Sequence, residues 1–298
     1  MTGRRVIEHL TRNAALGIRF WDVAEGTSAV DGLQVEVFSR ANPRARSPAL
    51  PNRSGVYVAH HVPGVRDFEF NNPGSDVLSP PAFHPYRVEV KDRAGRFLPM
   101  VFDADLPARG LFTWGAPWLS PPGMPALPGD PGSPPQLWRE RVPLFSAPTR
   151  PVPDPLGVVH AQLREQGTRR ELAWALLAVA IDGRTCGLGL ANEHGQVAVM
   201  FPYPEPPGRR LASPPELRED YDWQVELTAF VPHPSSPPGP VPEVADLAEV
   251  LAALDHPRAV VESLHSPAMP LRLAYRQALT VRTAGAPGVD ASYLLVSA

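Results

Sequence analysis

Few side chains in this sequence could do chemistry, and the histidines are the first to consider. His60 and His61 are adjacent, and His84 follows at a distance. A metal site needs ligands that converge on one point, whereas adjacent residues of a strand point to opposite faces. Both rings of the pair can therefore rarely reach one ion, and the spacing argues against a metal centre.

The acidic and sulfur-bearing candidates are equally sparse. Asp103 and Asp105 lie two residues apart and would share one face of a strand, where two carboxylates can work as a pair. A solvated strand end is the simpler interpretation. Cys186 is the single cysteine, which excludes a disulfide within the chain, and its place beside a glycine in an expected strand favours a small buried thiol over a nucleophile.

The sequence contains no nucleophile elbow, zinc-protease motif, phosphate-binding loop, dinucleotide-binding loop or paired-cysteine motif. We therefore expect a non-enzymatic protein with no catalytic residue, no cofactor and no metal. A hydrolase whose site follows none of these motifs is the enzymatic alternative.

Three tryptophans stand in a proline-rich stretch, residues 113–156. Exposing Trp114, Trp118 and Trp138 on a mobile tether would leave apolar surface in water, at roughly 25 cal/mol per Å². We therefore predict that this stretch docks, through these tryptophans and Phe145, either on its own chain or on a partner subunit. The tryptophans could alternatively form a sugar-binding platform, but anchoring is the favoured interpretation.

Proline is the outlier of the composition, with 39 of 298 residues, about 13% against a usual ~5%. Proline is excluded from helix interiors and central strand positions, so long helices have little room.

The net charge of −3 gives no pull toward nucleic acid. The N-terminus lacks the apolar run of a signal peptide, and no apolar stretch reaches the ~20 residues of a membrane helix, so we expect a cytoplasmic protein without a membrane span.

The elements that must position these residues are mostly strands. Alternating apolar and polar residues predict strands over 33–38 and 86–91, and Asp92-Arg-Ala-Gly95 predicts a hairpin turn into a return strand over 96–102. Residues 43–52 are expected to be a polar loop. Further extended segments are expected over 16–23, 54–58 and 68–70. Together they predict a first antiparallel sandwich over 16–112, after an N-terminal arm over 1–15.

A second antiparallel sandwich is predicted over 157–232. Its strands are expected over 157–163, 174–181, 185–190, 196–201 and 223–231. The turn Asn192-x-x-Gly195 matches Asp92-x-x-Gly95, which suggests that the two halves are divergent copies. Both glycines are expected at positive φ, because a tight hairpin bulge needs a residue without a Cβ.

The last region, 233–298, begins with a proline linker. Apolar residues at helical spacing predict one short helix over 244–254, followed by strands over 271–275, 279–282 and 293–296. The predicted fold is therefore mostly β: two small sandwiches joined by the connector 113–156, with one short helix near the C-terminus.

Two resemblances add to this interpretation. The stretches Phe20-Trp-Asp-Val-Ala-Glu-Gly26, Asp31-Gly-Leu-Gln-Val35, Ser54-Gly-Val-Tyr57 and Asp92-Arg-Ala-Gly-Arg-Phe97 resemble carboxypeptidase-regulatory-like, transthyretin-type β-sandwich domains. The segment from Val158 to Phe201 looks like a second copy. The resemblance implies spacer or interaction modules, which usually lack catalytic residues.

The second resemblance covers most of the chain. Segments such as Val62-Pro-Gly-Val-Arg-Asp-Phe-Glu-Phe70, Asp105-Leu-Pro-Ala-Arg-Gly-Leu-Phe112 and Met200-Phe-Pro-Tyr-Pro-Glu-Pro206 resemble a family encoded with phage-tail-like extracellular contractile injection systems. It implies a structural subunit of the baseplate, cap or fibre attachment, with sheath, tube, baseplate or cap proteins as partners and a homo-oligomer as a further option. Such a chain is made in the cytoplasm and assembled into a particle that can be released. The alternative is a carbohydrate- or cell-surface-binding β-sandwich module.

Overall fold

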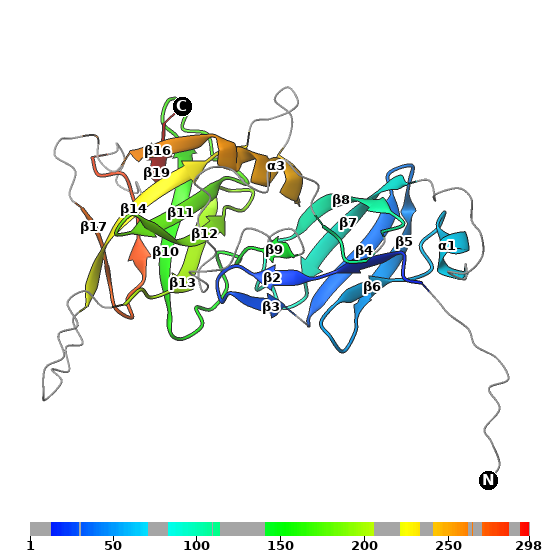
Figure 1. Ribbon diagram of the computed structural model, residues 1–298. Helices are drawn as coiled ribbons and strands as arrows, with labels where there is room; N and C mark the ends of the chain where they lie inside the picture. The colour runs from blue at the N-terminus through cyan, green and yellow to red at the C-terminus, as the bar shows by residue number, and fades with distance from the viewer. Residues whose placement is uncertain are drawn as a thin grey trace, which may run out of the picture.

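The chain is mostly β, as the sequence predicted. The computed structural model describes residues 13–29, 31–70, 83–108, 110–113, 141–205, 221–232, 241–261, 264, 270–285 and 293–297. Two large curled sheets lie beside each other, a small sheet lies between them, and a short helix near the C-terminus lies over the gap (Figure 1). Most strand pairs are antiparallel, but several are parallel, so both large sheets are mixed.

The first large sheet has the strand order β1-β6-β5-β4-β7-β8-β15. Its strands are β1 (Leu16–Ile18), β4 (Leu33–Ser39), β5 (Asn42–Pro51), β6 (Tyr57–Ala59), β7 (His84–Asp92), β8 (Met100–Leu106) and β15 (Ala245–Asp246). The register of β4 and β7 pairs Val35 with Val90 and Val37 with Val88. All four valines are buried, so the alternation in the sequence does mark the inner face.

Two local predictions in this half were wrong. Of residues 43–52, expected to be a loop, all but the last belong to strand β5, whose inner face is made by the small residues Ser47 and Ala49 rather than by an apolar run. Its outer face is held by Arg46, which pairs with Glu36 and Glu89 on neighbouring strands. Residues 68–70, expected to be extended, lie in the short helix α1 (Arg66–Phe70).

The small sheet joins two distant parts of the sequence. Its strands are β2 (Phe20–Asp22), β3 (Thr27–Ala29) and β9 (Val142–Leu144). β3 is antiparallel to β2, whereas β9 is parallel to it. β9 belongs to the end of the predicted connector 113–156, and this end is therefore built into the first half.

The second large sheet has the order β12-β11-β14-β16-β19-β10-β13, with β17 paired to β14 and β18 to β10. Its strands are β10 (Leu156–Glu165), β11 (Leu176–Ile181), β12 (Arg184–Leu190), β13 (Gln196–Pro202), β14 (Asp222–Phe230), β16 (Pro257–Val261), β17 (Leu271–Ala274), β18 (Leu279–Thr280) and β19 (Leu294–Val296). β10 is antiparallel to β13 but parallel to β18 and β19.

This sheet curls until its two end strands pack on each other, and glycines make the approach possible. A Cβ added at Gly187 would lie 2.8 Å from Cδ1 of Phe201, and one at Gly189 would lie 3.0 Å from the carbonyl oxygen of Ala198. A Cβ at Gly187 would force the Phe201 ring to shift, and one at Gly189 would press on the β13 backbone, so both glycines favour the close packing of β12 on β13.

The C-terminal region crosses back to the first half. The helix α3 (Leu247–Ala252) begins where the Asp246 carboxylate accepts a hydrogen bond from the Ala248 N–H, and it continues into a 3-10 turn, η1 (Ala253–Asp255). Just before it, β15 pairs with β8. Apolar residues of α3 and of β11 and β12 share one core with the first sheet: Leu247, Val250, Leu251, Leu176, Ala178, Leu188 and Leu190. The halves are thus interlocked.

Candidate functional site

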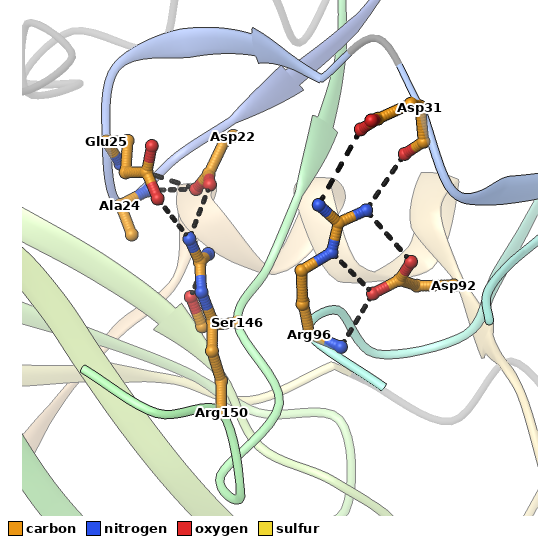
Figure 2. A network of polar contacts seen from close by, with 8 residues as sticks. All are labelled: Asp22, Ala24, Glu25, Asp31, Asp92, Arg96, Ser146 and Arg150. Carbon is orange, nitrogen blue, oxygen red and sulfur yellow. Dashed lines mark hydrogen bonds and ion pairs between the residues drawn. The ribbon is translucent and has the colours of Figure 1, made fainter. Parts of the chain in front are cut away.

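Arg150 is a buried charge that joins the small sheet to the segment leading into β10. Its side chain is only 5% exposed. Its Nη2 donates to Asp22 Oδ2 at 2.8 Å and to Glu25 Oε1 at 2.6 Å, and its Nη1 donates to Ser146 Oγ at 3.0 Å (Figure 2). A buried charge is tolerated only when it is paired and hydrogen-bonded, and Arg150 meets both conditions.

A second guanidinium, that of Arg96, lies close by in the same view (Figure 2). Its Nε donates to Asp92 Oδ2 at 3.0 Å, and its Nη2 donates to Asp92 Oδ1 at 3.1 Å and to the Asp31 carbonyl at 2.8 Å. Burial acts to raise the pKa of Asp92, but the hydrogen bonds and charge of Arg96 outweigh it, so this pKa lies below its ordinary value.

Phe97 connects the two guanidiniums. Its ring centroid lies 5.2 Å from Cζ of Arg96 and 5.0 Å from Cζ of Arg150. Phe97 also forms a β-bridge with Ser146. We call Asp22, Glu25, Asp92, Arg96, Phe97, Ser146 and Arg150 the arginine junction. The charges of the arginine junction are paired with one another. The junction therefore serves to hold together the β2–β3 turn, the β7–β8 hairpin and the segment that follows β9.

The residues that the sequence singled out for chemistry do not come together. His60 is half-buried, whereas His61 and His84 are exposed. Among the described residues, no group of three or more histidine, cysteine or acidic side chains could hold a metal ion. Asp103 and Asp105 are exposed on one side of β8, and Asp103 pairs with Arg40.

Cys186 lies on β12 and is partly buried, with its Sγ 3.4 Å from the Arg184 carbonyl oxygen. Burial raises the pKa of this thiol, and a thiol with a raised pKa is a poor nucleophile.

The predicted docking residues are divided. Trp114, Trp118 and Trp138 lie outside the described residues. Phe145 is fully buried in the core of the first half, and its carbonyl accepts a hydrogen bond from the Leu98 N–H at 3.0 Å. In the free chain, Phe145 is therefore part of the core.

An aromatic cluster in the second half was not found from the sequence. Tyr203 follows β13, Tyr221 and Trp223 stand at the start of β14, and Tyr275 follows β17. We call these four residues the aromatic tetrad. Tyr203 stacks on Trp223 with ring centroids 5.1 Å apart, and Tyr203 and Tyr275 lie 5.0 Å apart. The alternation Tyr221-x-Trp223 was a local signal, but only the pairing of β14 with β17 brings Tyr275 beside it.

The tetrad carries two unusual features. Trp223 is 4% exposed, and its Nε1 is buried without a hydrogen-bond partner among the described residues. Arg276, next to Tyr275, has a left-handed φ of +59°, and its backbone N–H donates to the Tyr203 hydroxyl at 2.9 Å. Burial raises the pKa of Tyr203.

An open hollow of about 470 Å³ lies over the β4–β5 turn and the start of β7. Its lining residues are Ser39, Arg40, Ala41, Gly64, His84, Pro85 and Tyr86. The polar groups of its wall are partly used inside the protein, since Tyr86 donates to the Pro63 carbonyl and Arg40 pairs with Asp103. This leaves a mostly apolar hollow with little to orient a ligand.

The sequence matches no protein-family model and no curated protein. Among solved structures, the chain has a weak similarity to a candidate adhesin from Bacteroides ovatus, with 8% sequence identity, 72% of each chain covered and a TM-score of 0.20. A similarity at this level supports no conclusion on fold or function. Within the described part of the chain, no helix is long and apolar enough to cross a membrane.

Proposed function

We propose that this protein is a non-enzymatic structural subunit of a contractile, phage-tail-like injection particle, in its baseplate, cap or fibre attachment. The observation that supports this best is the interlocking of the two halves. The chain leaves the first half, builds the second, and returns through β15 and α3 to the first. A subunit that works through its surfaces in a contracting assembly benefits from halves that cannot separate easily.

The arginine junction supports the same role. Arg150 ties Asp22 and Glu25 of the β2–β3 turn to a segment more than a hundred positions later in the chain. Trp174 Nε1 adds a link by donating to the Pro242 carbonyl at 3.1 Å. Buried pairs of this kind fix one arrangement of the elements, and an ordered surface loses less entropy when partners dock.

Kinship with transthyretin-type, carboxypeptidase-regulatory-like sandwiches is part of this proposal. It is supported by the shared Asp/Asn-x-x-Gly hairpins and by the resemblance of residues 20–97. In such a lineage, the curled mixed sheets would be elaborations of an antiparallel core, with β15, β18 and β19 as added parallel strands.

The expected partners are other subunits of the particle, including sheath, tube, baseplate or cap proteins and further copies of this chain. A carbohydrate- or cell-surface-binding module is the second candidate function, and the aromatic tetrad is the observation that favours it.

The experiment is to delete the gene in cells that make the particle and to image the particles by electron microscopy. A structural subunit predicts shortened, uncapped or baseplate-deficient particles that are restored by the tagged chain, which then co-elutes with sheath and tube proteins. Complementation by the same chain with Trp174→Phe, which removes the hydrogen bond to Pro242 and part of a buried ring, tests this link and should restore fewer normal particles. Normal particles in the deletion cells would reject the subunit role.

A further inference from the structure

Resting on the subunit role proposed above, we propose that the aromatic tetrad is a docking site for a proline-rich segment of a second copy of this chain. Tyrosine, tryptophan and arginine are the residues enriched where protein interfaces concentrate their binding energy. The tetrad combines three tyrosines, a tryptophan and Arg276 at one end of the second sheet.

The ring geometry favours a peptide over a sugar. Tyr203 and Tyr275 are tilted by 59°, and Tyr221 meets Tyr275 edge-on at 84°. The Arg276 guanidinium lies over the Tyr275 ring, 5.4 Å from its centroid. A pyranose ring stacks on a flat, open aromatic face, which rings tilted against one another do not offer. Proline-rich segments dock on grouped aromatic side chains.

The hydrogen-bonding groups are also complementary. Proline has no N–H, and an extended proline-rich backbone has unpaired carbonyls, so the ligand is rich in acceptors. The site offers a donor, because the Tyr203 hydroxyl accepts from the Arg276 N–H and keeps its own proton to donate. The unpaired Trp223 Nε1 and the left-handed backbone of Arg276 each lower the stability of the fold. Features that cost stability in this way are often kept at binding sites.

The chain itself contains a segment with matching chemistry. Residues 119–136 read Leu-Ser-Pro-Pro-Gly-Met-Pro-Ala-Leu-Pro-Gly-Asp-Pro-Gly-Ser-Pro-Pro-Gln, and Asp130 is their single charged residue. Its carboxylate complements Arg276 beside the tetrad. We take a second copy as the donor, because β8 and β9, the strands flanking this segment in sequence, lie toward the first half, away from the start of β14 and from β17 (Figure 1).

The test is a titration of the full chain with a synthetic peptide of residues 119–136, followed by calorimetry. We expect saturable binding that Tyr275→Ala weakens by roughly tenfold or more, the loss typical of one such anchor residue. Leu50→Ala, at an exposed apolar residue of the first half, is the matched control and should bind as the unchanged chain does. A peptide with every proline replaced by alanine should not bind.

A second variant covers the case in which Tyr275→Ala fails to fold. Arg276→Gly removes the guanidinium and relieves the left-handed φ, so it should keep the melting temperature and lose peptide affinity. Sedimentation of the full chain at rising concentration should show self-association that the same variant weakens.

Several outcomes overturn the proposal: no binding of the peptide to the unchanged chain, binding that neither variant changes, or glycan binding abolished by Tyr275→Ala in place of peptide binding. The failures of the two proposals can be told apart. A chain present in particles that does not bind the peptide rejects only the docking site. A chain absent from particles that binds the peptide at the tetrad rejects only the subunit role.

Discussion

The hairpin turns Asp92–Gly95 and Asn192–Gly195 are built alike. In each, the glycine N–H donates to the carbonyl of the first residue, at 3.1 Å in the first turn and 3.0 Å in the second. The side-chain oxygen of that first residue accepts the N–H four positions later, at 2.6 and 2.9 Å respectively. Both glycines have positive φ, +67° and +75°, as the sequence predicted.

Their surroundings differ completely. A Cβ at Gly95 would meet nothing within 4 Å, whereas one at Gly195 would lie 2.6 Å from the Leu163 carbonyl oxygen. Conversely, Asp92 is charged and built into the arginine junction, whereas Asn192 is neutral and its amide bonds Gln196 at 3.1 Å. The same local turn is therefore held by charge in one half and by close packing in the other.

The largest effect should come from Gly195→Ala. The new methyl group must displace the backbone at Leu163 and must also adopt a left-handed φ, so we expect a loss of about 3 kcal/mol or more in the free energy of unfolding. Urea denaturation of the full chain measures it. A loss below that of Gly95→Ala would show that the contact with Leu163 relaxes without cost.

Gly95→Ala should cost much less. Only the left-handed φ opposes the substitution, which corresponds to about 1 kcal/mol. Gly95→Val should cost more, about 1–3 kcal/mol. The same denaturation experiment checks both variants, and unchanged stability in both would contradict the turn geometry.

The pH dependence of stability should be present for the Asp92 turn and absent for the Asn192 turn. Asp92 has a lowered pKa in the folded chain, so its contribution to stability is present above the ordinary carboxyl pKa of 3.8 and is lost as the pH falls through the lower folded value. Asp92→Asn should therefore flatten the acid side of the stability profile. Asn192→Ala is the control, because a neutral side chain has no such linkage. Equal acid sensitivity in the unchanged chain and in Asp92→Asn would reject the assignment.

The smallest effect is expected at a third turn of the same construction, Asn52–Gly55. The Asn52 Oδ1 accepts the N–H groups of Ser54 and Val56 at 2.9 and 3.0 Å. The Asn52 side chain is exposed, so water replaces much of what is lost, and Asn52→Ala should cost about 0.5–1 kcal/mol. A loss as large as that of Gly195→Ala would show that the exposure of a turn does not determine how much stability its substitution costs.

The sequence was a good guide to local structure and a poor one to long-range pairing. Alternating apolar and polar residues predicted β7 and β14. The glycine turns were found because a positive φ strongly favours glycine. β5 was missed because Ser47 and Ala49, rather than large apolar residues, make its inner face. The parallel strands β15, β18 and β19 depend on distant partners that no local pattern records.

The candidate site shows the same limit. Asp92 and Arg96 were visible as turn residues, but Arg150 meets Asp22 only because β9 lies beside β2. The aromatic tetrad gathers residues from three separated segments, so its composition was present in the sequence and its convergence was not. The docking prediction for Trp114, Trp118 and Trp138 remains a prediction.

The subunit role is tested most directly by quantitative mass spectrometry of intact particles, purified through density gradients from cells that carry the tagged chain in place of the native one. A structural subunit should be present at a fixed ratio to the sheath protein in every preparation, and this ratio should survive a high-salt wash that removes surface-adsorbed protein. A chain that is absent from the purified particles, or present at a ratio that varies between preparations and falls with salt, would contradict the account.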